Sequence, residues 1–190
     1  AVNSYVVKYV TPGPCPDSAT ANITITNAPC ATFTYASASY CGNGTNPLPN
    51  FAGLCSGGVF SSTPGLSINS ATGEINLSAS TPGTYTVTNN IAPAGGCAAA
   101  SATTQVTIDP VPVVNAIPNQ TICNGASTTV INISGGPVGT TYAWTNSNPS
   151  IGLPASGRGD IQSFVAINNS TQMALAVINV YGASPDNCQT

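Results

Sequence analysis

Seven cysteines are the residues of this chain that are best able to do chemistry. The chain has no histidine, and no two cysteines have the CxxC spacing that is typical of zinc or redox pairs. Cysteines of this kind fit disulfides better than zinc, and disulfides persist in oxidising compartments. We therefore expect an extracytoplasmic protein, and the disulfide candidates are Cys15, Cys30, Cys41, Cys55, Cys97, Cys123 and Cys188.

Groups for acid–base or metal chemistry are sparse. General acid–base catalysis needs paired carboxylates or an imidazole, and a calcium loop needs several carboxylates close together. The five carboxylates have no acidic neighbours in the sequence, and we expect them to cap turns and solubilise the surface. The sequence therefore predicts no enzyme, no metal site and no cofactor. The five carboxylates are those of Asp17, Glu74, Asp109, Asp160 and Asp186.

The tripeptide Arg158-Gly159-Asp160 matches a known integrin-binding motif. Such a tripeptide often arises by chance, and here it lies in a Gly-rich stretch. We interpret it as a turn.

The charge of the chain limits its partners. Lys8 and Arg158 are the only basic residues, charged residues make up 4% of the chain, and the net charge is −3. Nucleic acid and anionic membrane surfaces both require clustered cations, so the sequence excludes them. No apolar run approaches the ~20 residues of a membrane-spanning helix, so we expect no membrane insertion. The chain also has no signal peptide or anchor, and we expect it to be an internal portion of a longer protein.

The sequence repeats at a period close to one small domain. Tyr5 precedes Tyr85 by 80 residues, the pair Cys41 and Cys123 is separated by 82, and Ile25 precedes Ile108 by 83. A looser third copy of the opening phrase ends at Cys188. This period predicts a tandem array of domains. We expect a truncated repeat over 1–27, a complete repeat over 28–109 and a repeat without its last strand over 110–190.

Alternating apolar and polar residues predict an all-β chain. Tyr85 and Val87 alternate with threonines, and Gly and Pro punctuate the sequence every few residues. We expect a hairpin in residues 1–27, a central strand beginning at Val59, and a buried Trp144 in the last repeat. We also expect the seven tyrosines mostly to face inward. The missing last strand leaves an apolar edge, which either a fragment boundary or a strand donated by another molecule explains.

Two stretches carry a family resemblance. The phrase GLSINSATGEINLSASTPGTYTVTN, with its ending GGCAAASATTQVTI, resembles the immunoglobulin-like repeats of giant Bacteroidetes surface proteins, notably the gliding-motility adhesins. The stretch NQTICNGAST…YAWTNSNPSIGLPASGRGDIQSFVAIN resembles the PKD-like domain of the same proteins. The resemblance implies tandem β-sandwich domains, type IX secretion, display on the bacterial outer surface, and a role in attachment or gliding motility.

The implied sandwich leaves two cysteine pairings open. Successive loops of such a sandwich alternate between its two ends, and a disulfide needs Cα atoms within about 7 Å. In the first alternative, Cys41 of one repeat pairs with Cys188 of the next. In the second, Cys41 pairs with Cys97 and Cys123 with Cys188 inside each repeat. Cys30 and Cys55 are expected to pair with each other in either case.

The resemblance also implies a modification site. Asp17-Ser18-Ala19 matches the pattern that Bacteroidetes O-glycosylate, so Ser18 is a candidate glycan site.

Two function classes follow from the sequence. The first is a structural and adhesive segment, either a disulfide-stiffened stalk or a surface filament. Its partners would be neighbouring repeats or identical subunits, and a surface glycan or a host or substratum ligand. The second is a carbohydrate-binding or accessory module of a larger secreted protein, which would need a platform of exposed aromatic side chains.

Overall fold

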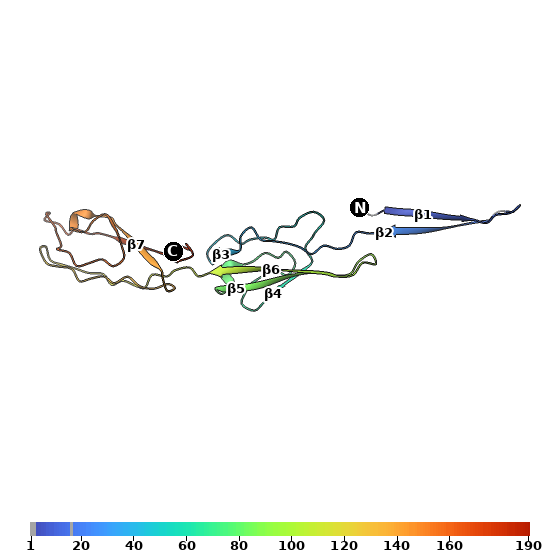
Figure 1. Cartoon of the computed structure of the whole chain (residues 1–190). Helices are drawn as coiled ribbons and strands as arrows, with labels where there is room; N and C mark the ends of the chain where they lie inside the picture. Colours follow the sequence, from blue (N-terminus) through green and yellow to red (C-terminus); the bar gives the residue numbers. More distant parts are fainter. Residues whose placement is uncertain (1–2, 16) are drawn as a thin grey trace. The chain divides into compact units, whose positions relative to one another are not determined.

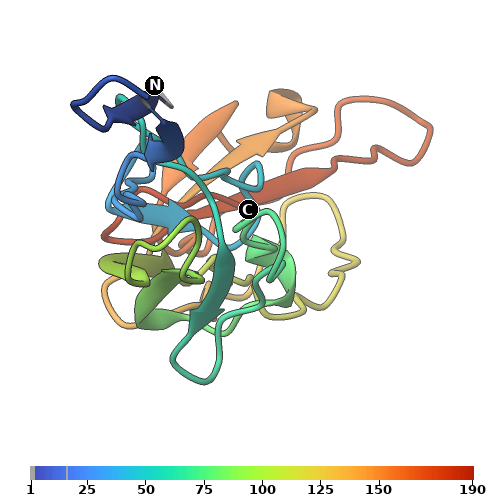
Figure 2. The ribbon, with the colours of Figure 1, turned by 90° about the vertical axis from the view of Figure 1, so that its right-hand side faces the viewer.

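The computed structural model describes residues 3–15 and 17–190. The chain divides into two compact units. Unit 1 comprises residues 1–38 and 45–107, and unit 2 comprises residues 39–44 and 108–190. The described residues form strands, turns and two short 3-10 helices, with no α-helix (Figures 1 and 2). None of the helices in the described part of the chain is long and apolar enough to cross a membrane. The chain is therefore all-β.

A two-stranded hairpin opens unit 1. Strands β1 (Asn3–Val10) and β2 (Ser18–Ile25) pair antiparallel, with Tyr5 opposite Ile23 (blue in Figure 1). Every residue of both strands is exposed. A hairpin of two strands has no core of its own, so its apolar side chains remain in contact with solvent. The sequence predicted a separate segment over 1–27, whereas the contacts group this hairpin with unit 1.

A four-stranded sheet forms the framework of the complete repeat. Its order is β3-β6-β5-β4, with β3 at Ser39–Cys41, β4 at Val59–Ser62, β5 at Gly83–Ile91 and β6 at Ala100–Asp109. Strand β4 is therefore an edge strand, and the prediction of a central strand there is wrong. No further strand among the described residues pairs with the outer side of β4. A 3-10 helix, η1 (Leu77–Ala79), precedes β5.

The core of unit 1 lies on one face of this sheet. Alternate residues of β5 and β6 point into it, as the period-2 pattern predicts, and the side chains of Val87 and Val106 are fully buried. The ring of Phe60 packs edge-on against Phe33, with centroids 5.4 Å apart. Leu66, Ile75 and Leu77 close the core from the 66–77 segment.

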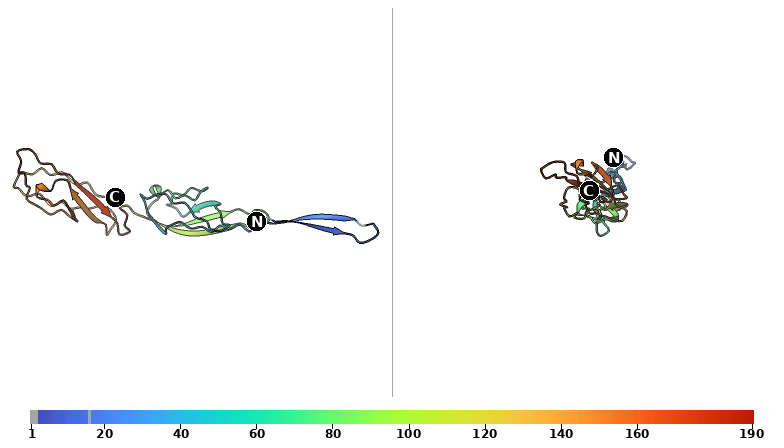
Figure 3. Two further views of the ribbon diagram at one scale, coloured as in Figure 1. Left: turned by 90° about the horizontal axis from the view of Figure 1, so that it is seen from above. Right: turned by 90° about the vertical axis from the view of Figure 1, so that its left-hand side faces the viewer.

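Unit 2 contains a three-stranded sheet of order β8-β7-β9. The strands are β7 (Thr141–Asn146), β8 (Ser156–Arg158) and β9 (Ile178–Ala183), and a 3-10 helix, η2 (Pro149–Ile151), lies between β7 and β8. Strands β7 and β9 run side by side (orange and red in Figure 3). Segments expected to be strands at 130–133 and 164–167 form only isolated bridges, including Ile131 with Ile161.

Trp144 is buried at the centre of unit 2, as predicted. It packs with Ile133, Leu153 and Ile161 in the core cluster. Its Nε1 is buried without a hydrogen-bond partner among the described residues, so packing alone holds the ring. The indole lies over Gly157, where any Cβ would overlap the ring. This contact explains a glycine at the β8 position opposite Trp144.

Candidate functional site

The first disulfide joins Cys30 to Cys55 in unit 1. The two Cα atoms are 4.3 Å apart, and the bridge spans 25 residues of sequence. The backbone N–H of Ser56 donates to the carbonyl of Cys30 at 3.0 Å, so a hydrogen bond reinforces the bridge. This is the pairing that the sequence suggested for these two cysteines.

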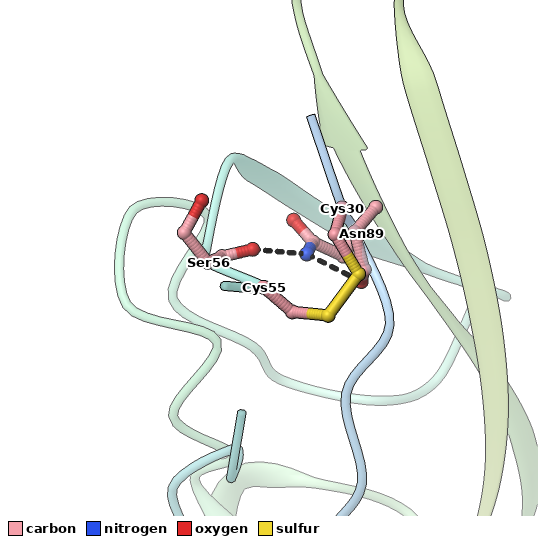
Figure 4. Close-up of a disulfide and its surroundings, with 5 residues drawn as sticks. Cys30, Cys55, Ser56 and Asn89 are labelled. Carbon is pink, nitrogen blue, oxygen red and sulfur yellow. Dashed lines mark hydrogen bonds between the residues drawn. A yellow bond between two sulfur atoms is a disulfide. The ribbon is translucent and has the colours of Figure 1, made fainter. Parts of the chain in front are cut away.

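A buried asparagine holds the segments on either side of this disulfide (Figure 4). The side chain of Asn89 in β5 is 0% exposed. Its amide nitrogen donates to the carbonyls of Ala31 at 2.8 Å and Ser56 at 2.9 Å, and its oxygen accepts from the N–H of Gly58 at 2.7 Å. Both hydrogens of the amide and one oxygen lone pair are therefore used. Asn89 ties the two cysteine-bearing segments to the sheet.

The second disulfide joins Cys41 to Cys188, with Cα atoms 5.5 Å apart and a sequence separation of 147. Neighbouring hydrogen bonds support it: Asn43 Nδ2 donates to the carbonyl of Gln189 at 2.9 Å, and the N–H of Cys188 donates to Ser184 Oγ at 3.2 Å. The structure thus has the first of the two pairings. The second, Cys41 with Cys97 and Cys123 with Cys188, is wrong because Cys41 and Cys188 share one bridge.

Three cysteines form no disulfide within the part of the chain that the structure describes. Cys15 and Cys123 are exposed, and Cys97 is partly buried. The sulfur of Cys97 lies 3.3 Å from Thr26 Oγ and 3.7 Å from the carbonyl oxygen of Asn27, just after β2. Cys15 and Cys123 are therefore open to solvent, whereas the sulfur of Cys97 is in contact with protein groups.

Unit 2 also carries a groove of about 740 Å³ with a largely apolar lining. One part of its lining comes from β9 and the preceding residues 173–177, and another from residues 117–122. Met173, Leu175 and Val177 are strongly exposed there. Strand β9 is an edge strand, and among the described residues only Gln189 and Thr190 pair along its free side. The groove therefore adjoins an open sheet edge with unburied apolar side chains.

The remaining sequence candidates are separate from these features. Asp160 Oδ1 accepts from the N–H of Ile133 at 2.8 Å, and the N–H of Gly159 donates to the carbonyl of Tyr142 at 2.9 Å. The Arg158-Gly159-Asp160 tripeptide thus comprises the last residue of β8 (Ser156–Arg158) and a bend at Gly159 and Asp160, and the Asp160 carboxylate supports the fold. The turn expected over the whole tripeptide begins only after Arg158. No group of three or more metal-ligating side chains occurs among the residues that the structure describes.

The candidate glycan site lies at the start of β2. Ser18 is exposed, and its N–H donates to Asp17 Oδ1 at 2.8 Å. Exposure leaves its hydroxyl accessible, and a glycan on Ser18 stays a prediction.

Two important features escaped the sequence reasoning. Asn89 is one asparagine in an Asn-rich chain, and its position on the inward face of β5, in phase with Tyr85 and Val87, was the available signal. The groove was foreseen only as an apolar edge. The residues that line it together with β9 come from segments 117–122 and 164–168, which no local pattern links to β9.

No protein-family model matches the chain, and no curated protein or solved structure is significantly similar to it.

Proposed function

We propose that the chain is a structural and adhesive segment of a large secreted bacterial surface protein, made of tandem immunoglobulin-like and PKD-like domains. It acts as a disulfide-stiffened stalk or filament in attachment or gliding motility, on the outer surface after type IX secretion. The observation that carries the proposal is the Cys41–Cys188 disulfide with its 147-residue separation.

This disulfide changes how the chain responds to tension. When the two ends of the chain are pulled, the force passes from residue 41 to residue 188 through the S–S bond. The residues between them are not in the loaded path, so they cannot be extended while the bond is intact. A domain that must transmit force without lengthening benefits from such a bypass, whereas an enzyme gains nothing from it.

A tyrosine contact supports the immunoglobulin-like part of the proposal. The hydroxyl of Tyr85, near the start of β5, donates to the carbonyl of Thr81 at 2.6 Å. A tyrosine that bonds the backbone a few residues upstream at the start of a late strand is a recurring corner of immunoglobulin-like sandwiches. The equivalent Tyr5 belongs to the hairpin, in keeping with a tandem array.

Single-molecule force extension tests the mechanical role. The chain is held by handles at its two ends and stretched with and without reductant. Reduction is expected to add about 500 Å of contour length, because roughly 3.3–3.6 Å is released per residue. Without reductant, the Cys41→Ser/Cys188→Ser variant should show about 400 Å of added contour length, because the Cys30–Cys55 bond still takes 25 residues out of its loaded path.

The Cys30→Ser/Cys55→Ser variant is the matched control. It keeps the bypass from residue 41 to 188, so its oxidised contour length should equal that of the natural chain. A natural oxidised chain that extends as far as the Cys41→Ser/Cys188→Ser variant would refute the mechanical role. Labelling of intact cells of the source bacterium with antibodies against residues 28–109 tests the outer-surface location.

One observation favours the second candidate, a carbohydrate-binding module. Tyr5 and Tyr9 lie on the same face of β1 and are exposed, and Tyr181 of β9 is also half exposed. The expectation that tyrosines mostly face inward is wrong for these three, because the hairpin and the edge of β9 have no covering layer. Exposed aromatic rings can stack on sugars. Specific binding of the chain on a glycan array, lost in Tyr5→Ala/Tyr9→Ala, would favour this candidate.

A further inference from the structure

The sequence contains two Asn-Gly pairs, Asn43-Gly44 and Asn124-Gly125, and all four residues are exposed. An asparagine that precedes glycine is prone to deamidation, because glycine has no Cβ to hinder the attack of its backbone nitrogen on the asparagine side chain. Asparagine counts among the thermolabile residues of proteins. Each pair is therefore a candidate site of spontaneous modification.

Deamidation requires a free backbone nitrogen and a free side chain. At the first pair, the nitrogen of Gly44 attacks Cγ of Asn43, and a C–N bond forms between them. The bond from Cγ to Nδ2 breaks, and ammonia leaves with the proton from the Gly44 nitrogen. Water then opens the succinimide ring and leaves aspartate or isoaspartate at position 43. Hydrogen bonds that hold the Gly44 N–H or the Asn43 carboxamide therefore slow the reaction.

Both reacting groups of Asn43-Gly44 are held beside the second disulfide. The N–H of Gly44 donates to the carbonyl of Cys41 at 2.9 Å. Asn43 Nδ2 donates to the carbonyl of Gln189, the residue after Cys188, at 2.9 Å. One acceptor thus belongs to a bridged cysteine and the other to the neighbour of its partner. While the S–S bond is closed, it keeps Gln189 within reach of Asn43.

The second pair has comparable hydrogen bonds but no disulfide beside it. The N–H of Gly125 donates to the carbonyl of Ala166 at 2.8 Å, and Asn124 Oδ1 accepts from the N–H of Asn168 at 2.9 Å. The adjacent cysteine, Cys123, forms no disulfide in the part of the chain that the structure describes. Asn124-Gly125 is therefore an internal control, with the same chemistry and a protection that involves no bridge.

We propose that Asn43-Gly44 is a deamidation site that the Cys41–Cys188 disulfide protects, and that Asn43 converts to aspartate and isoaspartate when this bridge is open. The inference goes beyond the proposed mechanical role and does not depend on it. It rests on the position of the bridge between the two hydrogen bonds that hold the reacting groups.

Opening of the bridge leaves the Asn43 side chain weakly held. A dithiol reductant breaks the S–S bond by two thiol–disulfide exchanges. It supplies two electrons and two protons, so that Cys41 and Cys188 become thiols and the reductant becomes a disulfide. The bond between Asn43 and Gln189 is exposed, and one such hydrogen bond shifts an equilibrium by only about two- to tenfold. Without the bridge, the carboxamide is therefore free for a substantial part of the time.

Deamidation would weaken the arrangement around the bridge. Aspartate at position 43 has no Nδ2 donor, and its carboxylate would face the carbonyl oxygen of Gln189, which can only accept. Isoaspartate also adds a carbon to the main chain. Both products disfavour the approach of Cys41 to Cys188, so the bridge should close more slowly after the modification.

Peptide mapping by mass spectrometry tests the protection. The full chain is incubated at mildly alkaline pH, where backbone nitrogens lose their protons more often, and the conversion of Asn43 and Asn124 is followed over time. The Cys41→Ser/Cys188→Ser variant, called here the open-bridge variant, is compared with the natural oxidised chain. Asn43 is expected to convert about two- to tenfold faster in the open-bridge variant, and Asn124 is expected to keep its rate.

Two further variants separate the bridge from other effects. Cys30→Ser/Cys55→Ser removes the other disulfide and should leave the rate at Asn43 unchanged. Gly44→Ala, added to the open-bridge variant, should slow the reaction because the new Cβ hinders the attack. Equal rates at Asn43 in the natural chain and the open-bridge variant overturn the proposal. An equal rise at Asn43 and Asn124 overturns it as well, because the protection would then not be specific to the bridge.

Reoxidation of a product mimic tests the effect on closure. Asn43→Asp and Asn124→Asp add the same charge, one at the proposed site and one at the control pair. Both variants are reduced and then reoxidised with glutathione disulfide, and formation of Cys41–Cys188 is followed by non-reducing peptide mapping. Asn43→Asp is expected to close the bridge about two- to tenfold more slowly than Asn124→Asp. Equal rates would show that the modification does not hinder closure.

Discussion

At the scale of single residues, buried polar groups and close contacts fix the geometry of each unit. Asn89 satisfies three backbone groups of two segments that would otherwise be held to β5 by apolar packing alone. Trp144 in unit 2 is held by shape, against a glycine. Unit 1 thus relies on a hydrogen-bonded clamp, and unit 2 relies on steric fit.

Replacement of Asn89 by Ala should destabilise unit 1 strongly. The change removes the hydrogen-bond partner of the buried carbonyl of Ala31 and of the partly buried carbonyl of Ser56 and N–H of Gly58. We expect a loss of about 2–4 kcal/mol in the free energy of unfolding, measured by urea denaturation. Asn90→Ala is the control, since Asn90 is exposed and adjacent, and it should change stability by less than about 0.5 kcal/mol. Equal effects of the two changes would contradict the clamp.

Replacement of Gly157 by Ala should disturb the core of unit 2. The new methyl group would overlap the indole of Trp144, so either the ring or strand β8 must shift, at a cost of about 1–3 kcal/mol. Trp144 is the only tryptophan, so its fluorescence reports the change directly. We expect a red-shifted emission and a lower unfolding temperature. Ser156→Ala, at the exposed neighbouring position of β8, should leave both unchanged.

At the scale of elements, the two disulfides differ chiefly in the length of chain that they close. Cys30–Cys55 joins two irregular segments beside β5, whereas Cys41–Cys188 joins the end of β3 to the loop after β9. Because Cys41 lies between Cys30 and Cys55 in sequence, the two closed loops overlap.

Removal of each disulfide should therefore cost different amounts. Chain-entropy estimates give about 3.5 kcal/mol for a loop of 25 residues and about 5 kcal/mol for one of 147 residues. We expect Cys41→Ser/Cys188→Ser to lower the unfolding temperature more than Cys30→Ser/Cys55→Ser. Scanning calorimetry under non-reducing conditions measures both. The reverse order would show that local packing around Cys30–Cys55 outweighs loop length.

At the scale of the whole molecule, the disulfides join parts of the chain that are far apart in the linear sequence. Lys8 and Arg158 are the only sites that trypsin can cut, and both residues are exposed. The Cys41–Cys188 bond joins the part of the chain after Arg158 to the part before it.

Trypsin should thus cut the chain at Arg158 without separating residues 159–190 from the rest, whereas cleavage at Lys8 frees a short peptide that contains no cysteine. After cleavage at Arg158, a non-reducing gel is expected to show residues 159–190 still attached, and reduction should release them. In the Cys188→Ser variant, denaturation alone should release the fragment. Release from the natural chain without reductant would mean that Cys41 and Cys188 are not joined.

The sequence by itself determined the all-β class and the burial of Trp144, and its internal spacings predict a tandem repeat. These properties follow from local alternation, Gly and Pro punctuation and fixed spacings, and each can be evaluated within a short window or by comparing two windows. The sequence also predicted the Cys30–Cys55 disulfide, because these two cysteines occur only in the repeat expected over 28–109.

Only the tertiary structure decided which of two pairings Cys41 adopts, that β4 is an edge strand, and that Asn89 is a buried clamp. Each of these depends on segments far apart in sequence meeting in space, as residues 31, 56 and 58 do around Asn89. The groove of unit 2 has the same origin. Its walls come from segments 117–122 and 173–180, and local periodicity carries no information on the packing of one segment against another.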